Sequence, residues 1–315
     1  MNPLPLVSIV MPALNAQCWI REALESCLGQ TWPNLEIIVI DNGSLDQTVD
    51  IALSFRSPRV HVLKCARTGA SAARNEGIAA SRGDYIQFLD ADDVLAPDKI
   101  LRQINLLACS PDCSIASGPW SRFVTHPGEQ ALMPEPVWRN CLPEEFLIKS
   151  WMGGGMMPIF GWLTPKHLIE AAGPWNEELS VNDDGEFFAR VVLASAKIVF
   201  CADATGYYRT VESASVSKGR GREAMVSALR AIDLSCSHLL GRVASSDARL
   251  ACATQYQRFS YSCFPAHHDL VRISEQRAHA LGGSTLECPG GAAFKVASAL
   301  LGWKTARRMQ VFTRP

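Results

Sequence analysis

Three carboxylates at the end of an apolar run are the side chains of this sequence with the clearest chemical potential. Asp90, Asp92 and Asp93 follow residues 84–89, whose apolar and aromatic side chains predict a buried strand. Like charges this close repel one another, and a divalent cation that bridges them to a phosphate would offset the repulsion. The cluster therefore predicts a site for Mg²⁺ or Mn²⁺. The alternative is a solvated acidic turn ahead of a helix that starts near Pro97.

A second acidic pair lies much further along the chain. Asp183 and Asp184 come shortly before the apolar segment 187–194, which predicts a helix. The helix macrodipole favours carboxylates at an N-terminus, so helix capping is enough to explain this pair from the residues alone.

The segments that must position the first cluster alternate between strand and helix. Apolar, β-branched runs predict strands, whereas helical spacing or a series of small residues predicts helices. The strands are expected at residues 7–11, 36–41, 60–63 and 84–89, and the helices at residues 20–28, 44–55 and 69–77, with Ser44 as the cap of the second helix. This order predicts an α/β fold with a mostly parallel, Rossmann-like sheet flanked by helices.

In such a sheet, the loops that follow the parallel strands meet at one edge. The loops concerned are residues 12–15, 41–44 and 90–93. Their convergence predicts a crevice of nucleotide size. The polar side chains expected around it are Asp41, Asn42, Asp90 and Asp92.

The later part of the chain gives fewer signals. The expected elements are a helix after Pro97, a helix from Pro165, a strand at residues 197–201 and helices beyond Lys218. Residues 113–163 show few periodic runs. Within them, the Gly- and Met-rich segment 153–157 could contact a second substrate or be a plain flexible loop.

Composition narrows the classes of function. The 315 residues carry a net charge of −1 and no basic stripe, so nucleic acid is not an expected partner. The N-terminus lacks the pattern of a signal peptide, and no run of about eighteen apolar residues predicts a membrane span. Eleven scattered cysteines in a chain of this size fit reduced thiols in the cytoplasm.

Two sets of thiol and imidazole side chains raise the question of a zinc site. They are Cys109 with Cys113, and Cys263 with His267 and His268. Neither spacing matches a closed zinc pattern, so buried or incidental residues are the preferred interpretation.

Five stretches, taken in order, resemble the motifs of family 2 glycosyltransferases, which have the GT-A fold. They are residues 7–15, 36–46, 73–78, 89–93 and 173–190, all within the first 217 positions. The resemblance implies a GT-A domain at residues 1–218, with a nucleotide-binding half at about 1–110 and an acceptor half at about 111–218. Residues 219–315 then form a helical C-terminal extension.

The resemblance also implies a role for each polar residue. Asp90-Ala91-Asp92 matches the Asp-x-Asp motif, in which Asp92 binds a divalent cation, Mn²⁺ or Mg²⁺, and Asp90 contacts ribose or the waters of the metal. The residues implied in donor nucleotide binding are Pro12, Ala13, Asn15, Asp41, Asn42, Arg74, Asn75 and Asp90. Asp183-Asp184 matches a catalytic Glu-Asp pair. Its second member, Asp184, would deprotonate the acceptor hydroxyl in a single displacement with inversion.

Three positions depart from the family pattern. Leu14 stands where many members have an aromatic residue, and Asn42 stands where a second aspartate accepts from uracil. The segment Tyr207-Tyr208-Arg209 is followed by Thr210-Val211-Glu212 rather than by a histidine near the diphosphate. A UDP-sugar is the first expectation for the donor, and dTDP and GDP stay open.

These roles predict an inverting glycosyltransferase of the hexosyl type. Its acceptor would be a glycan or a lipid-linked acceptor in polysaccharide or glycoconjugate synthesis. A sugar nucleotidyltransferase would need a Gly-rich phosphate loop, whereas Pro-Ala-Leu-Asn occupies residues 12–15. A non-catalytic nucleotide- or glycan-binding module on a degenerate GT-A fold is disfavoured because Asp90, Asp92 and Asp184 are present.

The last helical segment allows two interpretations. Apolar residues between positions 294 and 309 are interleaved with Lys295, Lys304, Arg307 and Arg308. A basic amphipathic helix could make peripheral contact with the inner face of a membrane, which would suit a lipid-linked acceptor. A helix packed on the domain explains the same pattern and is preferred.

Overall fold

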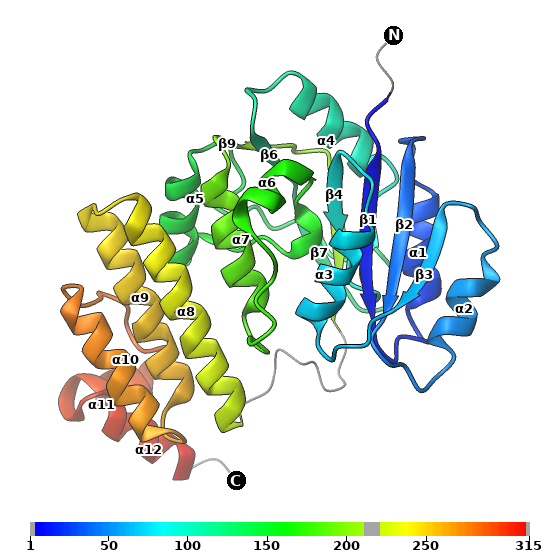
Figure 1. The fold of residues 1–315 in the computed structure, drawn as a ribbon. Coiled ribbons are helices and arrows are strands. Elements are labelled where there is room, and N and C mark those ends of the chain that lie inside the picture. The colour runs from blue at the N-terminus through cyan, green and yellow to red at the C-terminus, as the bar shows by residue number, and fades with distance from the viewer. Residues whose placement is uncertain (1–3, 211–220, 313–315) are drawn as a thin grey trace.

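A five-stranded sheet forms the core of the N-terminal part of the computed structural model, which describes residues 4–210 and 221–312 (Figure 1). Its strands, in spatial order, are β3 (Val60–Lys64), β2 (Leu35–Asp41), β1 (Val7–Ala13), β4 (Tyr85–Phe88) and β8 (Thr164–Pro165). The first four are parallel, and β8 pairs with β4 in the antiparallel direction. Every residue of β2 is buried, which explains its continuous apolar sequence. The predicted α/β class with a mostly parallel sheet is confirmed.

Four helices flank this half of the chain. They are α1 (Ile20–Leu28), α2 (Thr48–Ser54), α3 (Ala70–Ala80) and α4 (Lys99–Ala108). The predicted small-residue helix is α3, which contacts β1 and β2. A Cβ atom at Gly77 would stand 2.3 Å from Cγ1 of Val10, so only glycine permits this approach. The close packing of α3 carries Arg74 to the edge of the sheet where β4 ends.

The expected cap of α2 is wrong. The helix begins at Thr48 rather than next to Ser44, and Asp46 Oδ1 accepts a hydrogen bond of 3.0 Å from the Thr48 backbone N–H. Ser44 has another role, because its hydroxyl oxygen accepts from the backbone N–H of Asn15 at 3.0 Å. The loop after β1 therefore uses the side chain that the sequence pattern assigns to the helix.

Residues 94–209 contain mostly short elements, and within them only residues 113–163 gave little periodic signal. The helices expected after Pro165 and over residues 187–194 and the strand expected at residues 197–201 are present. The strands of this part are β5 (Val94–Leu95), β6 (Ser114–Ser117), β7 (Trp120–Phe123), β9 (Lys197–Phe200) and β10 (Gly206–Arg209). Its helices after α4 are α5 (Pro143–Lys149), α6 (Lys166–Ala172) and α7 (Asp183–Ala194), with a π-helical turn η1 (Ser150–Gly154) and a 3₁₀ turn η2 (Ile159–Gly161). β10 pairs with β5 and β7, and β6 pairs with β9. The segment 153–157 thus lies partly in the turn η1.

An aromatic core fixes α7 relative to the central sheet. Trp175 stacks on Phe187 with ring centroids 4.0 Å apart, and Phe88 at the end of β4 meets Trp175 edge-on at 5.3 Å. Phe188 adds a stacked contact of 5.6 Å with Trp162. Because these rings are buried and interlocked, the N-terminus of α7 has a defined position close to the end of β4.

The C-terminal part of the chain is helical, as expected. Its helices are α8 (Arg222–Arg242), α9 (Ser246–Cys263), α10 (His268–Ala280), α11 (Ala292–Leu301) and α12 (Trp303–Phe312). Met225 and Leu239 of α8 share a buried apolar cluster with Phe187 of α7, so the extension packs on the acidic-pair helix. The expected boundary at 218/219 lies outside the described residues. Across residues 4–210 and 221–312, no helix is both long and apolar enough to cross a membrane.

Candidate active site

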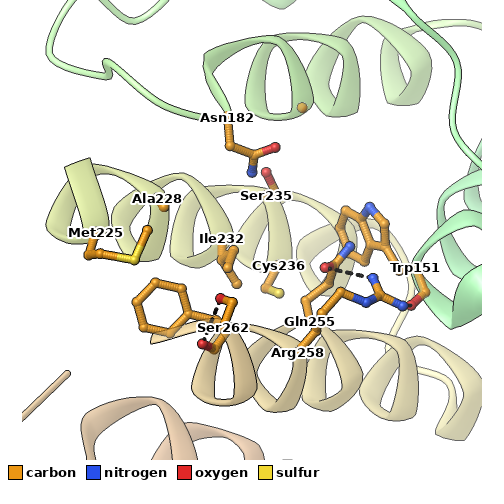
Figure 2. A pocket seen from close by; sticks show the side chains of 12 residues that line it. Trp151, Asn182, Met225, Ala228, Ile232, Ser235, Cys236, Gln255, Arg258 and Ser262 are labelled. Carbon is orange, nitrogen blue, oxygen red and sulfur yellow. Dashed lines mark hydrogen bonds between the residues drawn. The ribbon is translucent and has the colours of Figure 1, made fainter. Parts of the chain in front are cut away.

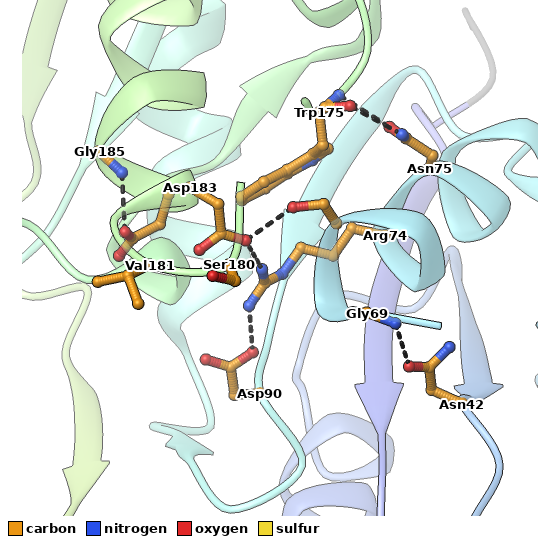
Figure 3. A network of polar contacts seen from close by, with 12 residues as sticks. Asn42, Gly69, Arg74, Asn75, Asp90, Trp175, Ser180, Val181, Asp183 and Gly185 are labelled. Atoms are coloured by element: carbon orange, nitrogen blue, oxygen red, sulfur yellow. Dashed lines mark hydrogen bonds and ion pairs between the residues drawn. The ribbon is translucent and has the colours of Figure 1, made fainter. Parts of the chain in front are cut away.

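One buried cation joins the two acidic clusters. Arg74 projects from α3, and its Nη2 lies 2.9 Å from Oδ1 of Asp90 while its Nη1 lies 3.1 Å from Oδ2 of Asp183 (Figure 3). The guanidinium also lies over the ring of Trp175, with its carbon 4.5 Å from the ring centroid. Two clusters that are 93 positions apart in sequence, from Asp90 to Asp183, therefore meet at a single side chain.

The electrostatics of Arg74 depend on this double pairing. Burial of the guanidinium disfavours its charge, but the carboxylates of Asp90 and Asp183 outweigh that cost and raise the pKa of Arg74. A buried cation is tolerated when opposite charges and hydrogen bonds compensate for lost water. The arrangement holds the loop after β4 and the start of α7 at a fixed separation.

Asp92 and Asp93, in the loop after β4, lie in different environments. Burial, followed by the charge on Asp90, raises the pKa of Asp92 to about 6. Asp93 is buried, accepts from the Arg209 backbone N–H at 2.9 Å, and has a pKa raised by burial and by Asp92. No side chain in residues 4–210 or 221–312 donates a hydrogen bond to the Asp92 carboxylate. Asp92 is thus available to a ligand, whereas Asp93 is committed to the fold.

Arg209 supports this loop, a role that sequence reasoning missed. Its Nε donates to the backbone oxygen of Asp92 at 2.8 Å, and its guanidinium also pairs with Glu22. The guanidinium carbon of Arg209 lies 4.7 Å from the ring centroid of Trp19 and 4.2 Å from that of Phe123. Arg209 belongs to the Tyr207-Tyr208-Arg209 motif, which could have indicated its role. Only the residues after this motif, Thr210-Val211-Glu212, were compared with the family pattern. Of those, Val211 and Glu212 lie outside the described residues.

The polar residues after β1 and β2 shape their own loops. Asn15 has a left-handed backbone (φ 50°), and its Oδ1 accepts from the Leu45 backbone N–H at 2.9 Å. Oδ1 of Asp41 accepts from the Ser44 N–H at 3.0 Å. Within the sheet, Pro12 and Ala13 pair with Ile40 and Asp41, as expected for neighbouring loops at one edge.

Asn42 is engaged by the segment that leads into α3. Its Oδ1 accepts from the Gly69 backbone N–H at 2.8 Å, and its Nδ2 donates to the Arg67 carbonyl oxygen at 2.7 Å. Both halves of the amide are therefore occupied by backbone. In this arrangement Asn42 positions the start of the helix that carries Arg74.

Asn75 makes a similar connection on the other side of α3. Its Oδ1 accepts from the Trp175 N–H at 2.8 Å, and its Nδ2 donates to the Trp175 carbonyl at 3.0 Å and to Glu177 at 2.8 Å. Asn75 therefore ties α3 to the segment that leads to α7 (Figure 3).

The acidic pair itself is asymmetric. Asp183 Oδ2 accepts from the Ser71 hydroxyl at 2.8 Å as well as from Arg74. The Asp184 side chain is exposed to solvent, and its only hydrogen bond within the described chain comes from the Gly185 N–H at 2.8 Å. Desolvation of the carboxylate, followed by the charge on Asp183, raises the pKa of Asp184. A carboxylate with one oxygen free of protein contacts and a raised pKa suits a general base.

Asp90 and Asp92 suit a divalent cation whose remaining ligands come from the phosphate oxygens of a substrate. In the described part of the chain, no group of three or more His, Cys, Asp or Glu side chains could enclose a metal ion. Asp90 and Asp92 nevertheless offer hard oxygen ligands, and the free carboxylate of Asp92 lies in a region of mutual repulsion. Mg²⁺ and Mn²⁺ are commonly held by one or two carboxylates plus phosphate oxygens, which is the chemistry these two residues can supply.

Sequence comparisons point to one family. Residues 8–161 match the family model described as glycosyl transferase family 2. A putative glycosyltransferase, EpsH of Bacillus subtilis, is 41% identical over 221 residues, which cover 68% of this chain and 63% of that protein. An uncharacterized glycosyltransferase of Haemophilus influenzae is 41% identical over 107 residues, or 33% of this chain. The chain spans only 43% of the length of that Haemophilus relative.

Structural comparisons agree on the fold. TarS (residues 1–349) of S. aureus superposes with a TM-score of 0.68 at 15% identity, over 99% of this chain and 92% of that one. The same S. aureus protein in complex with UDP-GlcNAc gives a TM-score of 0.62 at 16% identity, over 90% of this chain and 93% of that one. The mannosyltransferase PcManGT of Pyrobaculum calidifontis, in complex with GDP-Man and Mn²⁺, superposes with a TM-score of 0.57 at 15% identity. The match covers 98% of this chain and 84% of that one. The fold expected from the sequence motifs, GT-A, is confirmed.

Proposed function

We infer from the match of residues 8–161 that the chain is a member of glycosyl transferase family 2, and we propose that it transfers a sugar from a nucleoside diphosphate donor to an acceptor hydroxyl. The observation that carries the proposal is the Arg74 clamp, which joins the Asp90 loop to the Asp183-Asp184 pair. A transferase needs a leaving-group site and a base on either side of one reacting carbon. The clamp holds two such acidic groups in one rigid arrangement.

The donor is proposed to bind where the loops after β1, β2 and β4 converge. Asp90 would contact ribose, and Asp92 would hold Mn²⁺ or Mg²⁺ on the diphosphate. The bound cation would neutralise charge on the departing diphosphate. Among the structural neighbours, TarS is seen with UDP and UDP-GlcNAc, and PcManGT with GDP-Man and Mn²⁺. We take a UDP-sugar as the first donor to test, followed by dTDP- and GDP-sugars.

Asp184 is proposed as the base rather than Asp183. Asp183 is held by Ser71 and Arg74, whereas one oxygen of Asp184 accepts only from the Gly185 N–H and the pKa of this carboxylate is raised. In the proposed step the acceptor oxygen attacks the anomeric carbon, and its proton passes to the Asp184 carboxylate. The bond from that carbon to the diphosphate oxygen breaks, and the nucleoside diphosphate leaves with the electron pair. A single displacement of this kind inverts the anomeric configuration.

The acceptor is proposed to be a glycan or a lipid-linked acceptor in polysaccharide or glycoconjugate synthesis. All eleven cysteines are free thiols, which supports a reducing compartment such as the cytoplasm. Leu300 and Leu301 of α11 are 77% and 54% exposed, which supports peripheral contact with a membrane. Against that contact, Lys304 is paired with Glu275 at 2.6 Å rather than free. Vesicle flotation of the wild type and of Leu300→Ser tests whether this face binds anionic lipid.

The transfer reaction is tested with UDP-sugars and a panel of glycan and lipid-linked acceptors. Release of UDP is followed for the wild type and for Asp184→Asn, and the product is examined by proton NMR. The proposal requires acceptor-dependent release of UDP and an anomeric configuration opposite to that of the donor. A product with retained configuration rules out the single displacement, even if the chain is a transferase.

A further inference from the structure

A cavity of about 240 Å³ lies between the start of α7 and helices α8 and α9, beside the turn η1 (Figure 2). Asn182 and Gly185 line it, and these two residues flank the acidic pair in sequence. The cavity therefore borders the segment that carries Asp184. It is formed only because the C-terminal helices pack against the catalytic half of the chain.

The walls of the cavity are mostly apolar. Met225, Ala228 and Ile232 contribute from α8, and Trp151 contributes from η1 (Figure 2). Phe259 contributes from α9. Apolar walls with a few placed polar groups are the usual composition of sites that bind small organic groups.

Arg258 brings a positive charge to this apolar surface without an acidic partner. Its Nη2 donates to the Trp151 carbonyl oxygen at 3.1 Å, and its Nη1 donates to Oε1 of Gln255 at 3.3 Å. No acidic side chain lines the cavity, and none in residues 4–210 or 221–312 pairs with Arg258. Burial lowers the pKa of Arg258, which is the sign of a cation whose desolvation is not compensated. An anion would supply the missing compensation.

Asn182 adds a polar group at the opposite wall. Its backbone has the left-handed conformation (φ 59°), and its amide makes no hydrogen bond with the described residues. The side chain points toward the cavity rather than capping α7 (Figure 2). Asn adopts this conformation readily, and the exposed amide is available to a polar group of a ligand in the cavity.

We propose that this cavity is an acceptor subsite that binds an anionic group of the acceptor, a phosphate ester or a carboxylate, next to an apolar segment. The planar guanidinium of Arg258 matches the oxygens of such a group. The apolar walls then contact the carbon chain or sugar face beside it, and the hydroxyl to be glycosylated lies toward Asp184. The inference rests on the proposed transferase function, because it treats the neighbouring carboxylate as the base.

The test is calorimetric titration of the full chain with hexyl phosphate, hexanoate and glycerol phosphate. We expect at least one of these to bind the wild type, and we expect Arg258→Gln to weaken that binding about tenfold. Arg249→Gln, an exposed arginine on the same helix, is the matched control and should change nothing. The tightest probe identifies the source: hexyl phosphate indicates a lipid-linked acceptor, glycerol phosphate an anionic glycan, and hexanoate a carboxylate.

A second variant provides an independent test in case Arg258→Gln does not fold. Ala228→Leu fills the cavity from α8 and should abolish binding of every probe. The subsite is overturned if no anionic probe binds the wild type at millimolar concentration, or if Arg258→Gln and Arg249→Gln bind alike. A parallel titration with UDP separates the two proposals, because a failure of the donor site leaves the probe result intact.

Discussion

Arg74 Nη1 lies 3.1 Å from Oδ2 of Asp183, across 109 positions of sequence. The same guanidinium binds Asp90 at 2.9 Å, so one side chain of α3 sets the spacing of the donor loop and the base segment. The separation of Asp90 and Asp183 is therefore fixed by Arg74 and not only by the loops that carry the two aspartates. The rigid element of the site is therefore the small-residue helix and the sheet beneath it.

Removal of the Arg74 cation should cost both stability and organisation. Arg74→Met leaves two carboxylates without their shared partner, and we expect a loss of about 3 kcal/mol in the free energy of unfolding. Arg102→Met breaks the exposed pair with Asp98 and should cost less than about 1 kcal/mol. Urea unfolding of both variants measures the difference. Equal losses would show that the clamp contributes no more than a surface ion pair.

The close approach of α3 to the sheet gives a second test. In Gly77→Ala the new Cβ would meet Cγ1 of Val10 at 2.3 Å, and we expect a loss of about 1–3 kcal/mol. Gly241→Ala is the control, because a Cβ there meets nothing within 4 Å, and it should stabilise α8 by about 0.5–1 kcal/mol. Thermal unfolding compares the two. Opposite signs support the packing argument, and a stabilised Gly77→Ala contradicts it.

The two aspartates of the pair should separate in a kinetic experiment. Asp184→Asn removes the proposed base, and kcat should fall about 10²–10⁴-fold with the free energy of unfolding nearly unchanged. Asp183→Asn weakens the ion pair with Arg74, so it should lower stability as well as activity. Initial rates of UDP release and urea unfolding are measured on both variants. The assignment is wrong if Asp184→Asn keeps the wild-type kcat.

Lys99 predicts a pH dependence of stability. The amine is fully buried, donates to Gln87 at 2.7 Å and to Gln103 at 2.6 Å, and burial lowers its pKa to about 7. Between that value and the ordinary pKa of lysine, 10.5, the unfolded chain binds a proton that the native state lacks. Stability should therefore rise with pH in this window, by about 1 kcal/mol per unit.

Lys99→Met supplies the reference for that prediction. The variant lacks the titrating amine, so its free energy of unfolding should gain less between pH 7.5 and about 9.5 than that of the wild type. Urea unfolding at three pH values measures the two slopes. Parallel slopes would show that Lys99 is charged in the native state.

The parts of the fold that follow from local pattern were predictable. The strands β1 to β4, the helix α3 and the edge where the loops converge are encoded in continuous apolar runs and small residues. Ser44 shows the limit of such reasoning, because it is also a good cap by composition. Its hydroxyl is instead engaged by Asn15, a contact between loops that no local pattern reveals.

The parts of the site that depend on distant contacts were not predictable. Arg209 reaches the Asp92 loop through the pairing of β10 with β5, which only the assembled sheet defines. Arg258 and its cavity arise from packing between α9 and η1. Arg258 lies in no motif, and the motif that contains Arg209 does not show which loop this residue supports. The significance of both residues depends on neighbours that lie far away in the sequence.

The most direct test of the central claim is calorimetric titration of UDP, dTDP and GDP, each with and without Mn²⁺. The proteins are the wild type, Asp92→Ala and, as a control with an exposed carboxylate, Asp112→Ala. We predict that one nucleotide binds the wild type and Asp112→Ala in a Mn²⁺-dependent manner, and that Asp92→Ala loses this binding. Absence of binding for every nucleotide, with the wild type folded, would contradict the proposed donor site and favour a non-catalytic role.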